Sequence, residues 1–120
     1  MKHDALVARA ADNVVDEMPW GRLAWMVSGP IGNSTTMTVG RSEIQPRQSN
    51  PRHFHANCDE VVQVLSGTVV HTMDDEEYEM SVGDTLSIPA GVVHNARNTG
   101  DEVAVLALTF SSAYREVAPE

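Results

Sequence analysis

Short apolar runs, separated by Gly, Pro, Asn and Asp, dominate the chain. Apolar and polar residues alternate with a period of two in segments 23–27 and 77–82, which indicates β-strands. Other runs are rich in the strand-favouring residues Val, Ile, Thr and Leu, near residues 61–65, 68–73, 85–88 and 102–110. We therefore expect about nine or ten short strands joined by tight turns.

Strands of this number and length predict an all-β fold, either a sandwich or a small antiparallel barrel. Closure into a barrel removes exposed strand edges, and a small barrel holds one small ligand at its mouth. The length of 120 residues predicts one domain, residues 1–120. We treat residues 1–20 as an N-terminal arm, within which segment 5–18 fits a helical turn or an edge strand followed by a loop.

Composition narrows the classes of function. The formal charge of −9 repels phosphate backbones and anionic lipid, so we expect no nucleic-acid or membrane partner. No apolar stretch reaches the ~18 residues of a membrane span, and the N-terminus lacks the apolar core of a signal peptide.

Cys58 is the only cysteine, which fits a reducing compartment and a cytoplasmic location. The acidic run 74–77 is best interpreted as a solvated hairpin tip and not as a cation site.

The segment from residue 50 to 67 carries the first candidate chemistry. Side chains at positions i and i+2 of a strand share a face, so His53 and His55 project together. A loop at 56–59 reverses the chain, and Glu60 opens the next strand, where it can face back toward the two imidazoles. Val62 and Val64 would continue the same inward face.

A second segment, residues 83–98, supplies a third imidazole. A turn at 89–91 precedes His94, and a hairpin folded over the first segment would bring His94 to the same point. Three imidazoles and one carboxylate suit one divalent transition metal ion: Mn, Fe, Co, Ni, Cu or Zn. Structural zinc sites are usually rich in cysteine, which this set is not. A six-coordinate ion would keep two positions open for water, substrate or oxygen.

These two segments resemble the signature motifs of the cupin superfamily. The first motif, 53–67, has His53-x-His55, Glu60 and a closing Gly67. The second, 83–98, has Gly83, Pro89-x-Gly91, His94 and Asn98. The resemblance implies a single small jelly-roll barrel, also called a double-stranded β-helix, with four metal ligands: His53, His55, Glu60 and His94. The family's first motif usually begins with a glycine, and here Arg47 occupies that position.

The resemblance leaves three functions open. The first is an oxygen-using, dioxygenase-like metalloenzyme acting on a small organic substrate. The second is a redox-neutral isomerase, lyase or cyclase, in which the metal polarises an oxygen of the substrate. The third is a non-catalytic small-molecule-binding barrel. In the enzymatic alternatives Glu60 is also the candidate catalytic residue, as a base.

The resemblance further implies a homodimer that pairs through a sheet face, to which Val61, Gln63 and Leu65 could contribute. Other residues receive structural interpretations. We expect Asn98 to brace a turn and Cys58 to be a small loop residue near the pocket mouth. We expect His3 and His71 to be structural or surface residues. Four large apolar residues could line a specificity pocket, but we expect them mainly in the core, with one or two on the pocket wall: Trp25, Met26, Met37 and Met73.

Overall fold

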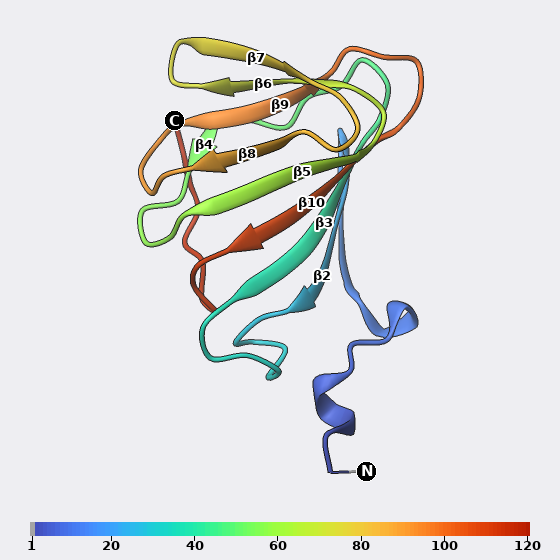
Figure 1. Cartoon of the computed structure of the whole chain (residues 1–120), viewed down its shortest axis with the longest axis vertical. Coiled ribbons are helices and arrows are strands. Elements are labelled where there is room, and N and C mark those ends of the chain that lie inside the picture. Colours follow the sequence, from blue (N-terminus) through green and yellow to red (C-terminus); the bar gives the residue numbers. More distant parts are fainter. Residues whose placement is uncertain (1) are drawn as a thin grey trace.

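Two antiparallel sheets form a jelly-roll in the computed structural model, which describes residues 2–120 (Figure 1). The six-stranded sheet has the order β1 (Val14–Met18), β2 (Gly21–Val27), β3 (Thr38–Ile44), β10 (Ala104–Phe110), β5 (Glu60–Ser66) and β8 (Thr85–Ile88). The five-stranded sheet has the order β11 (Ala118–Pro119), β4 (His53–Phe54), β9 (His94–Asn98), β6 (Val69–Met73) and β7 (Glu76–Met80). The predicted all-β class is confirmed. The described residues form slightly more strands than expected, because β4 and β11 are two-residue strands that no sequence period reveals.

The core lies between the sheets and follows the strand period. In β5, Val62 and Val64 are buried, whereas Val61, Gln63 and Leu65 are exposed on the outer face. The neighbouring β10 buries Leu106, Leu108 and Phe110 in the same way. Each large apolar side chain buried in this manner stabilises the fold by about 1.5–3 kcal/mol.

The N-terminal segment combines both alternatives considered for residues 5–18. Two 3-10 helices, η1 (Asp4–Leu6) and η2 (Ala10–Asp12), bury no residue and extend away from the sheets (Figure 1). The edge strand β1 follows and pairs with β2. No helix within residues 2–120 has the length and apolar character needed to cross a membrane.

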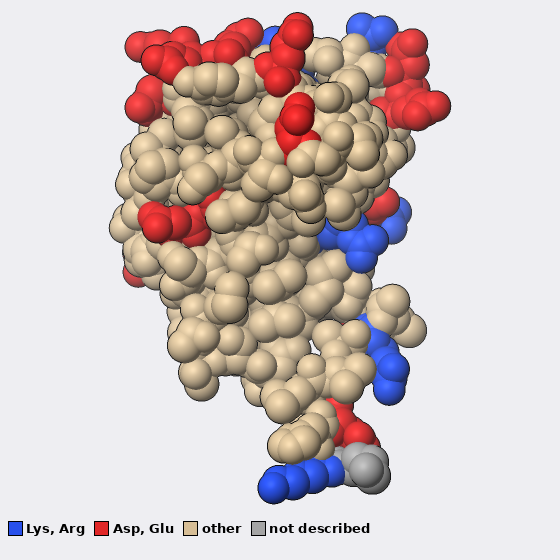
Figure 2. Space-filling model, in the orientation of Figure 1, with Lys and Arg blue, Asp and Glu red and all other residues tan. Residues whose placement is uncertain are grey.

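The acidic run lies in the β6–β7 hairpin, and its side chains are exposed, as predicted. Acidic side chains gather at this end of the molecule (Figure 2). The alternation over 77–82 correctly indicates a strand, but of its apolar residues only Met80 is buried. Tyr78 and Val82 remain exposed because β7 is an edge strand that ends at Met80.

Asn98 braces the connection between β9 and β10, as predicted. Its buried side-chain amide donates to the carbonyls of Ile44 (2.8 Å) and Glu102 (2.7 Å), and its side-chain oxygen accepts from the Gly100 N–H (2.9 Å). These bonds tie the turn after β9 to the end of β3.

Arg47 adopts the backbone conformation that a glycine would favour at this position. Its φ is +65°, in the left-handed region, and its side chain pairs with Asp101 at 2.7 Å. The turn thus keeps a left-handed residue although the glycine of the family motif is absent. A left-handed conformation costs a non-glycine residue ~1–2 kcal/mol.

Replacement of Arg47 should reveal this cost. We expect Arg47→Gly to be more stable than Arg47→Ala by about 1 kcal/mol, because both variants lose the exposed ion pair and only glycine relieves the backbone. Urea unfolding measures the difference. The matched control is Arg41, an exposed residue in the extended strand β3, where the order should reverse and alanine should be the more stable replacement. Equal stability of the two Arg47 variants would show that the left-handed backbone at this position carries no cost for a non-glycine residue.

Candidate metal centre

The four predicted residues converge at one point between the sheets. His53 lies on β4, His55 directly follows that strand, and His94 begins the adjacent strand β9, where it pairs in register with His53. Glu60 begins β5 of the opposite sheet. One potential ligand atom from each residue lies within 4.8 Å of all the others, and the cluster could hold a metal ion.

Backbone carbonyls fix the orientation of all three imidazoles. The Nδ1 atoms of His53, His55 and His94 lie 2.7, 2.8 and 2.9 Å from the carbonyl oxygens of Pro51, Glu116 and Val92, respectively. A carbonyl oxygen only accepts, so each Nδ1 carries a proton and donates it. In a neutral ring this leaves the lone pair on Nε2, which is the atom a metal binds.

Glu60 is the anionic member of the cluster and is only 5% exposed. Its Oε1 lies 2.9 Å from His94 Nε2 and 3.2 Å from His55 Nε2. Burial raises the pKa of the Glu60 carboxyl, but the adjacent His55 and His94 outweigh burial and lower it to about 2. The residue is therefore a carboxylate at neutral pH.

The histidines respond differently to the same surroundings. Burial lowers the pKa of His53 to about 4, so this ring is neutral at pH 7. Burial also lowers the pKa of His94, but its hydrogen bond to Glu60 and the Glu60 charge raise it by more, and the net shift is upward. Without an ion, Glu60 thus favours a proton on His94 Nε2, and a metal ion must displace that proton to bind there.

The residues fit a transition-metal ion by a direct structural criterion. His55 Nε2 is buried and has no hydrogen-bond partner, although Glu60 Oε1 lies 3.2 Å away. A buried polar atom without a hydrogen-bond partner costs about 1–3 kcal/mol. A cation coordinated by this nitrogen would remove that cost, and three imidazole nitrogens with one carboxylate form a common transition-metal donor set.

The cluster opens into a cavity of about 380 Å³. Its walls are mainly apolar and come from both sheets, including Trp20, Leu23, Trp25, Val62, Leu106 and Phe110. A cavity of this size and lining accommodates a small organic molecule.

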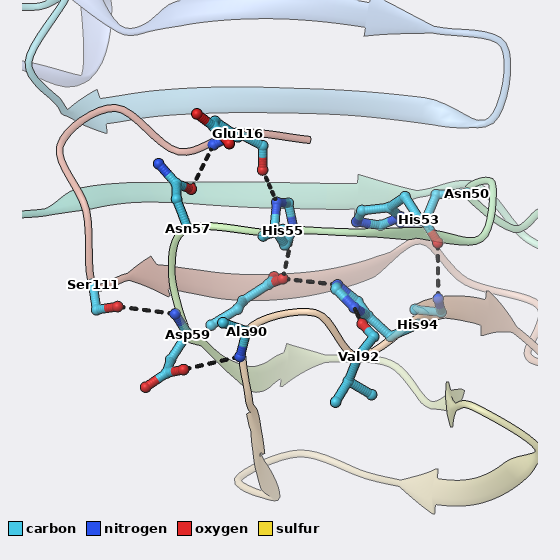
Figure 3. Close-up of polar contacts among 12 residues, drawn as sticks. Asn50, His53, His55, Asn57, Asp59, Ala90, Val92, His94, Ser111 and Glu116 are labelled. Carbon is cyan, nitrogen blue, oxygen red and sulfur yellow. Dashed lines mark hydrogen bonds and ion pairs between the residues drawn. The ribbon is translucent and has the colours of Figure 1, made fainter. Parts of the chain in front are cut away.

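The C-terminal segment closes one side of the site. Asn57 donates to the Tyr114 carbonyl (2.8 Å), and its side-chain oxygen accepts from the Glu116 N–H (2.8 Å). These bonds place the Glu116 carbonyl where it accepts from His55 Nδ1 (Figure 3). Farther along, β11 pairs with β4, the strand of His53. Neither motif extends to this segment, so the sequence analysis missed its contribution.

Comparison with known proteins agrees with this geometry. Residues 40–110 match the family described as "Cupin domain", which is more than half of the chain. The chain belongs to the cupin family.

The cupin shares 29% identity over 86 residues with Protein SchB of Streptomyces halstedii, covering 72% of this chain and 62% of the relative. It shares 26% identity over 91 residues with Polyketide synthase CurC of Streptomyces cyaneus, covering 76% and 59%. It thus spans less than two thirds of the length of these curated relatives. A structure of Bacillus subtilis oxalate decarboxylase, a protein with Mn(II) centers, superposes with a TM-score of 0.84 at 21% identity, covering 92% of this chain and 31% of the other. That likeness concerns the fold.

His71 is a cavity residue of this cupin that the sequence analysis interpreted as structural or surface. It lies on β6, is 3% exposed, lines the cavity and stacks on the His94 ring with centroids 5.8 Å apart. Burial lowers its pKa to about 4, so the ring is neutral at pH 7. It belongs to no motif, and only the register of β6 beside β9 reveals its position. His3 is exposed, as expected.

Two further interpretations need correction. Cys58 is a small loop residue, as predicted, but it is buried in the hydrophobic core and does not line the cavity. Burial and the nearby Glu60 raise the pKa of its thiol, which disfavours a reactive thiolate. Met37 is exposed and not part of the core, because it precedes β3 at the end of a surface loop. Trp25 is buried and also lines the cavity.

The buried His71 should make the metal-free protein sensitive to acid. Its folded-state pKa of about 4 lies below its ordinary 6.5, so the unfolded chain binds more protons between these values. Stability should therefore be complete above pH 6.5 and should fall as pH drops toward 4, by about 3 kcal/mol from this residue.

Urea unfolding of wild type and His71→Gln across this range measures the effect. Glutamine does not titrate, so the variant should lose less stability in acid. His3→Gln, at an exposed position on the arm, is the control and should follow wild type. Parallel stability curves for wild type and His71→Gln would show that the buried imidazole is not the acid-sensitive group.

Proposed function

We propose that this cupin is an oxygen-using, dioxygenase-like metalloenzyme that acts on a small and largely apolar organic substrate. The ion would be held by His53, His55, Glu60 and His94. The observation that carries this proposal is that the four-residue cluster opens directly into an apolar cavity.

The donor set and its surroundings suit this chemistry. Four protein ligands would leave two positions free on a six-coordinate ion for substrate or dioxygen. Bound iron or manganese would supply redox chemistry between dioxygen and the substrate. The apolar walls exclude water and offer a favourable environment to dioxygen, which is itself apolar.

The chain's own residues have distinct roles in this proposal. The carbonyls of Pro51, Val92 and Glu116 hold the imidazoles in the metal-binding tautomer. Glu60 supplies the one negative charge of the donor set and is the candidate catalytic base. His71 is neutral beside His94 and can accept or return a proton in the cavity.

A redox-neutral lyase, isomerase or cyclase is the second candidate. The relative named Polyketide synthase CurC favours it, because polyketide assembly and ring closure need no dioxygen. The same cavity would then hold the substrate near a Lewis-acidic ion such as zinc, and His71 or Glu60 would move the proton.

Metal substitution under controlled atmosphere distinguishes the two candidates. The full chain is loaded with Fe(II), Mn(II) or Zn(II) and incubated with a panel of aromatic acids, phenols and enolisable ketones. Oxygen uptake and product mass are recorded in air and under argon. We expect turnover in air with iron or manganese, and none under argon or with zinc.

His94→Gln is the variant for this experiment, since it removes one proposed ligand, and Val82→Glu on the surface is its control. His94→Gln should lower turnover by at least about 100-fold, whereas Val82→Glu should not change it. Turnover with zinc under argon would instead establish the redox-neutral alternative. Turnover that survives His94→Gln in full would refute a role for the cluster.

We also propose that the protein is a cytoplasmic homodimer that pairs through the outer face of the six-stranded sheet. On β5, Val61 and Leu65 are 40% and 46% exposed, and Gln63 lies between them. Across β10 and β3, Val61, Thr109 and Val39 stand in register on this face. The surface seen where Figure 1 draws these strands has few charged side chains (Figure 2).

Light scattering tests the dimer. Wild type should have twice the mass of one chain, and Leu65→Glu should shift the mass toward one chain, because it buries a charge in the proposed interface. Val82→Glu introduces the same charge at an exposed apolar residue outside this face and should leave the mass unchanged. A wild-type mass of one chain at all accessible concentrations would contradict the dimer.

A further inference from the structure

Two arginines line the cavity, and their partners differ. Arg52 forms an ion pair with Glu120, through Nε–Oε1 at 2.8 Å and a second bond of 3.0 Å, and donates to Thr72 Oγ1 at 3.2 Å. Arg115, on the C-terminal segment, has no hydrogen bond and no carboxylate within 4.0 Å anywhere in residues 2–120. Its charge is therefore available to a ligand, whereas that of Arg52 is already neutralised.

Aromatic rings hold the Arg115 guanidinium at the cavity wall. Its Cζ lies 4.1 Å from the centre of the Trp25 ring and 5.3 Å from that of Phe110. Stacking uses the flat face of a guanidinium, while the five N–H donors point outward in its plane. Arg115 is thus positioned by its ring contacts, and its N–H donors have no hydrogen-bond partner among residues 2–120. Burial lowers the pKa of Arg115, but arginine stays protonated at neutral pH.

Arg115 is also close to the metal-binding cluster. The Phe110 ring that contacts the guanidinium packs edge-on against His55, with ring centres 5.0 Å apart. The next residue, Glu116, accepts the His55 Nδ1 hydrogen bond, which anchors this part of the segment. The Phe110 ring therefore lies between Arg115 and the cluster, and a ligand that touches both would pass along this ring.

The other charges at this wall do not neutralise Arg115. Asp16 lines the cavity nearby, but its carboxylate accepts from the Trp25 indole N–H at 3.1 Å and forms no ion pair with the guanidinium. The Glu60 carboxylate is engaged by His55 and His94. An incoming anion consequently meets one cation with free donors, surrounded by apolar side chains.

We infer that Arg115 is the anion-binding group of the cavity and that the substrate is a largely apolar organic monocarboxylate. Its carboxylate accepts two hydrogen bonds from the guanidinium fork, and its apolar body lies against Trp25, Phe110 and Leu106. This inference rests on the proposed function in one respect: a metal ion would face the end of the substrate opposite its carboxylate. A small dicarboxylate such as oxalate has no apolar body to fill the cavity and should bind poorly.

Binding of 2-naphthoate to the zinc-loaded full chain tests the inference, with Trp fluorescence or calorimetry as the readout. The neutral analogue 2-naphthamide and oxalate are the comparison ligands. Arg115→Met removes the charge and keeps a long apolar side chain, so naphthoate should bind about 10- to 100-fold more weakly. Binding of 2-naphthamide should change by less than about threefold, because it loses no charge-assisted bond.

Two matched variants keep the test independent of folding and of net charge. Arg115→Lys retains the charge without the planar fork and should give an intermediate naphthoate affinity. Arg9→Met makes the same change of net charge at an exposed position between η1 and η2, outside both the cavity and the proposed dimer face, and should bind naphthoate like wild type. An unchanged affinity in Arg115→Met, or an equal loss in Arg9→Met, would overturn the assignment.

The outcomes for the two proposals can be separated. Naphthoate binding that depends on Arg115, together with no turnover of any tested compound, would refute the enzymatic function and leave the anion site in place. Turnover of neutral compounds with a kcat/KM that Arg115→Met does not change would refute the anion site and leave the enzymatic function in place.

Discussion

Three hydrogen bonds from imidazole Nδ1 to backbone carbonyls determine what the rest of this structure can do. They hold His53, His55 and His94 in one tautomer and aim their Nε2 atoms at a common point beside Glu60. Side-chain partners could rotate away or titrate, but carbonyls fixed by strands and turns cannot. The ability of the cluster to hold an ion is therefore a property of the folded backbone.

Two of these three bonds are local in the sequence, and the third joins distant parts of the chain. Pro51 and Val92 are each two residues from the histidine that they orient, so short-range geometry suffices there. His55 instead depends on Glu116, which is 61 residues away. The C-terminal segment thus completes the cluster with a carbonyl and brings Arg115 to the cavity wall. One segment thereby connects the orientation of a proposed ligand with the proposed recognition of substrate.

The all-β fold could be predicted from short-range patterns, whereas the convergence of the four residues as one ligand set was implied by the resemblance to the cupin motifs. The i, i+2 spacing places His53 and His55 on one face, but His94 reaches them through the pairing of β9 with β4, which are distant in the sequence. His71 was missed because its position depends on how β6 pairs with β9, which no local pattern specifies. Arg115 was missed for a similar reason, since its ring contacts come from β2 and β10. Arg47 shows the converse, because the fold imposes a glycine-like conformation on a residue that does not favour it.

The most direct test of this account is the metal content and coordination of the protein purified without added metal, by elemental analysis and X-ray absorption. We expect close to one transition-metal ion per chain, bound by imidazole nitrogen and carboxylate oxygen. His94→Gln should lose most of this ion, and His71→Gln, altered at the neighbouring ring outside the cluster, should keep it. A wild-type protein that binds no transition metal even after loading, or a His94→Gln variant with the wild-type content and spectrum, would contradict the account.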